Sequence, residues 1–215
     1  MKTAKKYSDR LHVVEIVLLG ALGVFLLSGA VSLRQQEALA DKVVRLHVLA
    51  NSDSEEDQAL KLRVRDAVLA EAETMLESAA DREAAMEILQ TQLPRLEETA
   101  AEAVAANGYR YGVDVRLETA EFPTKEYDGF TLPAGEYLAL RVLIGEAAGQ
   151  NWWCVVFPPL CTAAAADVPA AAMSAGMSDE QVRLITEENT GYVLKFKCVE
   201  LWQQLKERFE GEEQP

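Results

Sequence analysis

The amino-acid sequence predicts an α+β fold: a mainly antiparallel sheet of about four to five strands with helices packed against it, after an N-terminal apolar helix. Two observations predict the sheet and the helices. Segments of alternating polarity, typical of strands, occur near residue 45 and over residues 109–117, and two segments with apolar residues at helical spacing lie between them. Strands and helices that are grouped apart along the chain favour an α+β domain. The 215 residues, 49% apolar and 26% charged, suffice for one domain or at most two small ones.

The beginning of the chain is basic and then apolar. Four basic residues lie within the first ten positions, and residues 16–33 then carry no charge. A secretory signal peptide cleaved near residues 28–30 or 38–40 fits this pattern. So does an uncleaved anchor, because these residues span about 27 Å as a helix. A buried core helix fits poorly. Either of the first two interpretations exports the body of the protein and keeps the basic start in the cytoplasm.

The predicted organisation has three parts. Residues 1–40 are the signal peptide or membrane anchor with a short linker, residues 41–210 are one α+β extracytoplasmic domain, and residues 211–215 are a frayed tail. The net charge of −14 excludes nucleic acid as a partner, because phosphate binding needs clustered lysine and arginine.

The body begins with an alternating strand over residues 44–48. Its apolar residues lie on one face, and Arg45 and His47 lie on the other. Ser52 and Glu55 have the spacing of a capping box, which predicts that a helix starts there. The spacing of Asp57 and Lys61 predicts an ion pair on the exposed side of this helix.

A second helix is predicted over residues 81–107, with Gly108 ending it and Pro94 kinking or dividing it. Residues 109–117 alternate as a half-buried strand. Residues 121–137 contain two prolines and two glycines, which are typical of a long loop.

Two segments, residues 137–144 and 152–157, are apolar on both faces, which is typical of central strands. A short glycine-containing loop joins them, so an antiparallel hairpin is predicted. Pro158 and Pro159 end the second strand. Ser178 and Gln181 predict a second capping box, for a helix to residue 189, and a short strand over 192–197 and a final helix over 199–210 follow.

Catalytic motifs are scarce in this sequence. It contains no HExxH, paired CxxC, GxSxG or glycine-rich phosphate loop, so we expect no metal and no cofactor. Cys154 and Cys161 form a possible disulfide if the chain folds back at the two prolines, and buried free thiols are the alternative. A cysteine nucleophile paired with His47 is a further, weaker interpretation.

The adjacent Trp152 and Trp153 must point to opposite faces of their strand. Burial of both is favoured. In the alternative, an exposed tryptophan would anchor a protein partner.

Four stretches, RLHVLANSDSEEDQALKLRVRDAV, FPTKEY, LPAGEYLALRVLIGEAAGQNWWCVVFPPLC and YVLKFKCVE, follow the leader in this order. They resemble stage II sporulation protein R of endospore-forming Firmicutes. The resemblance implies a signalling protein that is made in the forespore and exported into the space between the forespore membrane and the mother-cell membrane. There it is needed to activate a membrane-embedded protease of the mother cell, which processes a sigma-factor precursor.

The resemblance brings no catalytic residues, and we expect a protein ligand rather than an enzyme. The expected partner-binding surface combines the start of the first helix with the second apolar strand: Asn51, Ser52, Asp53, Asn151, Trp152, Trp153, Pro158 and Pro159. Two other functions stay open, an extracytoplasmic hydrolase with a cysteine nucleophile and a structural membrane or cell-wall module.

Overall fold

The computed structural model of the chain describes residues 19–20, 23, 34–161 and 167–186. Two units are distinguished, Met1–Ala38 and Leu39–Pro215, and all the elements below belong to the second. The predicted N-terminal apolar helix lies almost wholly outside the described residues, as do the predicted strand over 192–197, the final helix and the tail. Within the described ranges, none of the helices has the length and apolar character needed to cross a bilayer.

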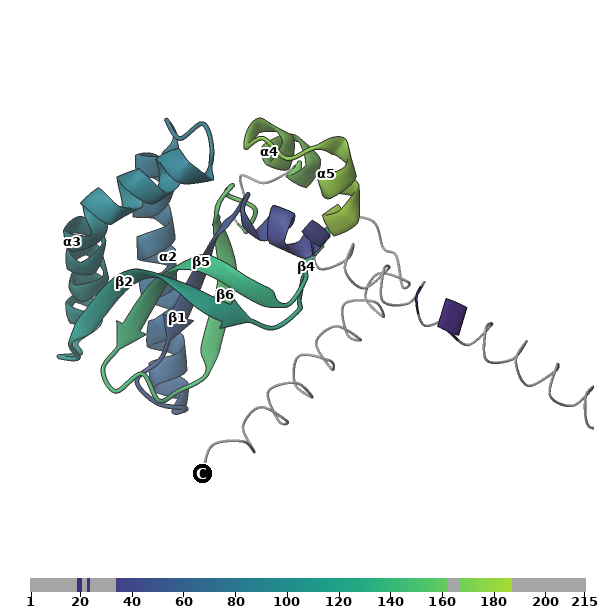
Figure 1. Ribbon diagram of the computed structural model, residues 1–215. Helices are drawn as coiled ribbons and strands as arrows, with labels where there is room; N and C mark the ends of the chain where they lie inside the picture. Colours follow the sequence, from purple (N-terminus) through teal and green to yellow (C-terminus); the bar gives the residue numbers. More distant parts are fainter. Residues whose placement is uncertain (1–18, 21–22, 24–33, 162–166, 187–215) are drawn as a thin grey trace, which may run out of the picture. The chain divides into compact units, whose positions relative to one another are not determined.

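The elements follow one another in this order: β1 (Val44–Leu49), α2 (Glu55–Leu76), α3 (Arg82–Ala106), β2 (Val113–Phe122), β3 (Lys125–Tyr127), β4 (Phe130–Leu132), β5 (Gly135–Ile144), β6 (Asn151–Phe157), α4 (Val168–Ser174) and α5 (Asp179–Thr186). Figure 1 shows their arrangement. Four strands form one sheet in the order β2-β5-β1-β6, and β3 and β4 form a small antiparallel pair. In the large sheet only β1 and β5 are parallel, and the other two pairings are antiparallel. The predicted α+β class with a mainly antiparallel sheet is confirmed.

The predicted hairpin between β5 and β6 is wrong, because β1 lies between them. β1 is therefore a central strand and β6 forms an edge of the sheet, whereas the sequence suggested a central position for β6. The loop from β5 to β6 must cross the end of β1, and backbone hydrogen bonds hold it there. The amide of Ala148 donates to Asn51 O at 3.2 Å, and the amide of Gly149 donates to Ala50 O at 3.0 Å.

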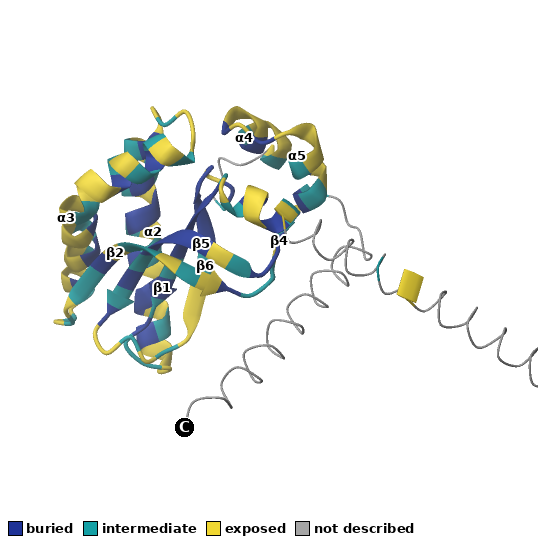
Figure 2. Cartoon of the chain, viewed as in Figure 1, coloured by how far each residue is buried: buried dark blue, intermediate teal, exposed yellow. Residues whose placement is uncertain are grey.

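Buried apolar side chains pack on both faces of the sheet, but the second face is covered only in part, since Arg116 there is exposed and His47 and Arg141 are half-buried (Figures 1 and 2). On one face, Leu46 of β1 and Leu140 of β5 pack with apolar residues of α2 and α3 in a single buried cluster. On the other face, Tyr137 and Val155 pack with residues of β4, α4 and α5. The alternation along each strand therefore supplies side chains to two cores.

The start of α2 differs from the prediction. Its N-cap is Ser54, whose hydroxyl accepts a hydrogen bond from the amide of Asp57 at 3.2 Å, and Ser52 instead donates its hydroxyl to Oδ2 of Asp57 at 2.6 Å. Ser52 and Ser54 both have suitable side chains, so the motif alone does not locate the cap.

The predicted exposed ion pair between Asp57 and Lys61 is also wrong, since both residues are only 4% exposed. Asp57 accepts hydrogen bonds from Ser52 and from the Asn51 amide, which donates at 2.8 Å. Lys61 Nζ donates to Gln58 Oε1 at 2.6 Å and to Gln150 O at 2.8 Å. The loop that crosses the end of β1 therefore covers this side of α2.

Asp57 should make stability depend on pH. The hydrogen bonds from Ser52 and then Asn51 lower its pKa below the ordinary value, against the effect of burial. A carboxyl with a lowered folded-state pKa stabilises the protein above its unfolded pKa of about 3.9 and loses this contribution as the pH falls through the folded value. In urea unfolding between pH 6 and pH 2, we expect Asp57→Asn to lose less free energy of unfolding on acidification than the unchanged protein. Glu102→Gln, at an exposed position, should follow the unchanged protein, and equal slopes for all three proteins would contradict the prediction.

The other helix ends largely agree with the sequence. α3 begins after its N-cap Asp81 and ends before its C-cap Asn107, with Gly108 at φ +83°, and it continues through Pro94 without division. The capping box of α5 is confirmed in both directions, since Ser178 N donates to Gln181 Oε1 at 2.9 Å and Gln181 N donates to Ser178 Oγ at 3.2 Å. The predicted long loop over residues 121–137 is wrong in part, because β3 and β4 form within it.

Candidate functional site

A groove of about 580 Å³ runs beside the edge strand β6. We call it the edge groove. Residues of α2 line one wall, residues of β3, β4 and their turn line the other, and β6 and the segment after it lie between them. The lining residues are Arg65, Asp66, Leu69, Ala70, Glu73, Tyr127, Asp128, Phe130, Trp152, Trp153, Cys154, Leu160, Cys161 and Val168.

The two tryptophans point to opposite faces of β6, as the sequence predicts. Trp152 is 39% exposed, with the guanidinium carbon of Arg65 4.3 Å from its ring centroid. Trp153 is half-buried, lies 5.7 Å from the His47 ring in a stacked arrangement, and has Lys125 Nζ 3.9 Å from its ring centroid. The favoured interpretation, in which both tryptophans are buried, is therefore wrong. Each tryptophan instead presents a cation-capped ring to the groove.

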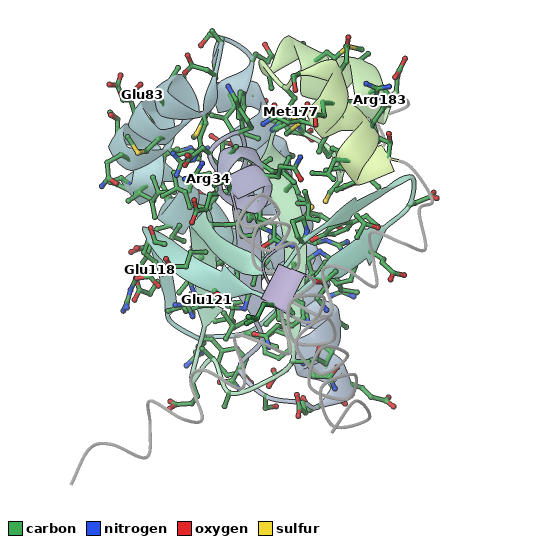
Figure 3. All side chains as sticks on the ribbon, turned by 45° about the vertical axis from the view of Figure 1, so that its right-hand side comes forward. Arg34, Glu83, Glu118, Glu121, Met177 and Arg183 are labelled. Atoms are coloured by element: carbon green, nitrogen blue, oxygen red, sulfur yellow. The ribbon has the colours of Figure 1, made fainter. Side chains whose placement is uncertain are left out.

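The two edges of the large sheet differ in charge. β2, at one edge, carries Asp114 paired with Arg116, and Glu118 paired with Arg141 of β5; Figure 3 labels Glu118 on this strand. Charged side chains on an edge strand oppose pairing with further strands. β6, at the other edge, has no charged residue over its seven positions. Only the β6 edge therefore lacks this protection.

Part of the β6 edge is open for hydrogen bonding. The Val155 amide points away from β1 and donates to the Cys161 sulfur at 3.1 Å. Alternate residues of a strand direct their backbone groups to the same side, so Trp153 and Asn151 also direct theirs outward. Within the described ranges, no strand pairs with this side of β6. The edge groove thus contains a short row of backbone donors and acceptors beside two aromatic rings.

A buried arginine lies under the β3–β4 pair. Arg45 is fully buried, on the face of β1 opposite Val44, Leu46 and Val48. Its guanidinium carbon lies 4.1 Å from the Phe122 ring centroid and 4.8 Å from that of Tyr137, and its Nη2 donates to the Tyr127 hydroxyl at 2.7 Å. Burial raises the pKa of Tyr127 to about 12, so this hydroxyl stays protonated and neutral. Arg45 therefore holds Tyr127 in place in the groove wall.

The two cysteines also meet at the groove. Both are free thiols, with Cys154 buried and Cys161 partly exposed. A hydrogen bond from Cys154 and one from the Val155 amide lower the pKa of Cys161, and Arg45 and Arg65 act in the same direction, although burial opposes them. The same thiol–thiol hydrogen bond and burial raise the pKa of Cys154. The chain thus folds back at Pro158 and Pro159 as a bridge requires, with the bond itself unformed.

His47 occupies a different position from the one a cysteine nucleophile needs. Its Nε2 hydrogen-bonds Asn151 Oδ1 at 2.7 Å, and its ring packs against Trp153. Burial lowers the pKa of His47, and the charges of Arg141 and Arg45 add to this effect against the Asn151 hydrogen bond. No hydrogen bond in the described part of the chain joins His47 to either sulfur. Among all the residues that the structure describes, there is likewise no group of three or more potential metal ligands.

The other candidate residues lie in two further places. Asn51 and Asp53 hold the loop that crosses β1, since Asn51 Oδ1 accepts from the Glu146 amide at 3.0 Å and Asp53 Oδ1 accepts from the Gln150 amide at 2.8 Å. Pro158 and Pro159 line a separate cavity of about 330 Å³ between the end of α2 and α4. The edge groove therefore unites only the two tryptophans and the two cysteines among the predicted site residues.

Among the residues that the sequence prediction did not include, Arg65, Lys125 and Tyr127 make the polar and cation–ring contacts at the groove. Arg65 resembles any exposed residue of an amphipathic helix, and the other two belong to a segment whose prolines and glycines predict a loop. The aromatic Tyr127 and Phe130, stacked at 4.6 Å between centroids, are the available signal for a short strand pair.

The fold and the site define an α+β domain with one uncharged sheet edge beside an aromatic groove. The family model for Stage II sporulation protein R matches residues 40–167, and the chain belongs to this family. It is 40% identical over 127 residues to "Stage II sporulation protein R" of Bacillus subtilis (strain 168), which covers 59% of this chain and 57% of that relative. The chain thus matches less than two thirds of that curated relative's length. No solved structure matches it.

Proposed function

We propose that this chain is an exported sporulation signalling protein that activates a membrane-embedded protease of the mother cell, which then processes a sigma-factor precursor. Family membership supports the role in sporulation signalling. The finer proposal adds that the protein acts in the space between the forespore and mother-cell membranes, secreted or tethered by its N-terminal segment. The basic and then apolar leader supports export.

The edge groove is the proposed contact with the protease. The observation that supports this assignment is the place of the groove residues in the sequence. All the lining residues except Val168 lie within residues 40–167, which the family model matches. We propose that an extended segment of the protease's exposed region adds a strand to β6 at Asn151–Trp153, with apolar side chains against the tryptophans. Added strands gain affinity from main-chain hydrogen bonds and specificity from adjacent pockets.

The export step can be tested in sporulating cells that lack the native protein. The full chain should restore processing of the sigma-factor precursor, and a Leu22→Arg/Leu26→Arg variant should not, because two charges in the apolar segment oppose its entry into the membrane. A Leu62→Arg variant carries a new charge on the exposed side of α2 and is the control for synthesis and stability. Unchanged processing by the leader variant would exclude extracytoplasmic action.

The cysteine-hydrolase alternative is supported by one observation, the lowered pKa of Cys161. Separate Cys154→Ala, Cys161→Ala and His47→Ala variants distinguish the two functions. A ligand keeps signalling in every variant that folds, whereas a cysteine hydrolase loses it when its nucleophile is removed.

A further inference from the structure

We propose that Cys154 and Cys161 are an oxidisable pair that closes to an intramolecular disulfide when the protein meets a disulfide oxidant. The oxidant belongs to the class of small or protein disulfides, written RSSR. The inference stands on the positions of the two sulfurs and does not rest on the proposed function.

The position of the turn after β6 brings the sulfurs together. The amide of Leu160 donates to Pro158 O at 2.7 Å, and this tight turn returns the chain toward β6. Cys161 Sγ then lies 3.1 Å from the Val155 amide nitrogen, next to Cys154 in sequence. Both cysteines line the edge groove. Because the Val155 nitrogen is bonded to the carbonyl carbon of Cys154, formation of the bridge needs only a short movement of the Cys161 side chain.

The two thiols differ in reactivity as an attacking and a resolving cysteine do. Cys161 is partly exposed and lines the edge groove, and its thiolate is stabilised by the Cys154 thiol and the Val155 amide. Cys154 also lines the groove but is only 2% exposed. A thiolate that is accessible and electrostatically stabilised is the one that attacks a disulfide.

The reaction balances in two exchanges. The Cys161 thiolate attacks RSSR, forms a mixed disulfide with one R–S group and releases RS⁻. Cys154 then loses its proton to RS⁻ or water, and its sulfur attacks Cys161 Sγ and displaces the second RS⁻. Two thiols of the protein have been oxidised, and one RSSR has been reduced to two RSH. The bridge ties the turn to β6 and fixes the groove where Leu160 and Cys161 line it.

Mass spectrometry tests the pairing on the full chain in mild detergent, with Cys198→Ser to remove the third thiol. The reduced protein should bind two N-ethylmaleimide groups after unfolding. After exposure of the folded protein to 2-hydroxyethyl disulfide, it should bind none and should be lighter by two hydrogens. A non-reduced peptide map should join Cys154 to Cys161. The same map on the chain without substitution repeats the test if Cys198→Ser fails to fold.

Three results would overturn the proposal: two thiols still open to alkylation, stable 2-hydroxyethylthio adducts, or a disulfide between two protein molecules.

Single variants test the order of attack. The Cys154→Ser variant should stop at a mixed disulfide on Cys161. The Cys161→Ser variant, which lacks the attacking thiolate, should react at least about tenfold more slowly. Closure of the bridge should raise the Tm by roughly 5 °C. An unchanged or lowered Tm in the bridged protein would show that the native fold does not accommodate the bridge.

Discussion

Replacement of Gly149 by alanine should lower the free energy of unfolding by about 3 kcal/mol and the Tm by roughly 6–12 °C. A Cβ at this position would lie 2.2 Å from Ser52 O and 2.5 Å from Ser52 C, both backbone atoms. The Gly149 amide also donates to Ala50 O at 3.0 Å, so the loop cannot move away without loss of that hydrogen bond. Thermal and urea unfolding of the full chain measure the effect.

Gly112→Ala is the matched control. A Cβ added at Gly112 would meet no atom within 4 Å, and this glycine has no positive φ, so its replacement should change the free energy of unfolding by about 0.5 kcal/mol or less. If the two alanine variants unfold at the same temperature, the close approach of the loop to the end of β1 is not maintained in solution.

Replacement of Trp152 by alanine should weaken the proposed binding to the mother-cell protease about 30-fold, which corresponds to about 2 kcal/mol, and should reduce precursor processing accordingly. Trp152 is 39% exposed in the free protein, and its ring, covered by Arg65, forms part of the edge groove. An exposed tryptophan that becomes covered on association is typical of a binding hot spot. The loss should appear in the dissociation rate more than in the association rate.

Leu62→Ala, on α2, controls for the loss of an exposed apolar side chain outside the groove, since Leu62 is 36% exposed and does not line it. This variant should bind and signal as the unchanged protein does. Full processing by Trp152→Ala, at an equal protein level and with an unaltered Tm, would remove the edge groove from the contact surface.

The sequence was sufficient for features that depend on neighbouring residues. Alternation located β1, and Ser178 with Gln181 gave the correct start of α5. Gly108 correctly predicted the end of α3, where a positive φ is needed. Each of these signals acts over a few positions and needs no knowledge of the rest of the fold.

Features that depend on distant residues could not be predicted in this way. The insertion of β1 between β5 and β6 pairs Arg45 with Ala139 and with Val155, and no local pattern specifies such pairings. The burial of Arg45, Asp57 and Lys61 follows from that topology, because charged side chains are normally exposed unless distant segments cover them. For the same reason, the sequence did not predict that α2 and the β3–β4 pair form the walls of the edge groove.

The central position of β1 has a consequence for the order in which the protein is made. The ribosome delivers β1 first, and Ala139 follows Arg45 only after roughly 5 to 20 s of synthesis. The sheet cannot close during that time, and the chain remains without its central pairings until β5 has emerged. In a nascent chain that ends before Asn151, β1 can pair with β5 on one side, but β6, its partner on the other side, has not yet been made. Completion of the large sheet therefore waits for the strand that also carries both tryptophans.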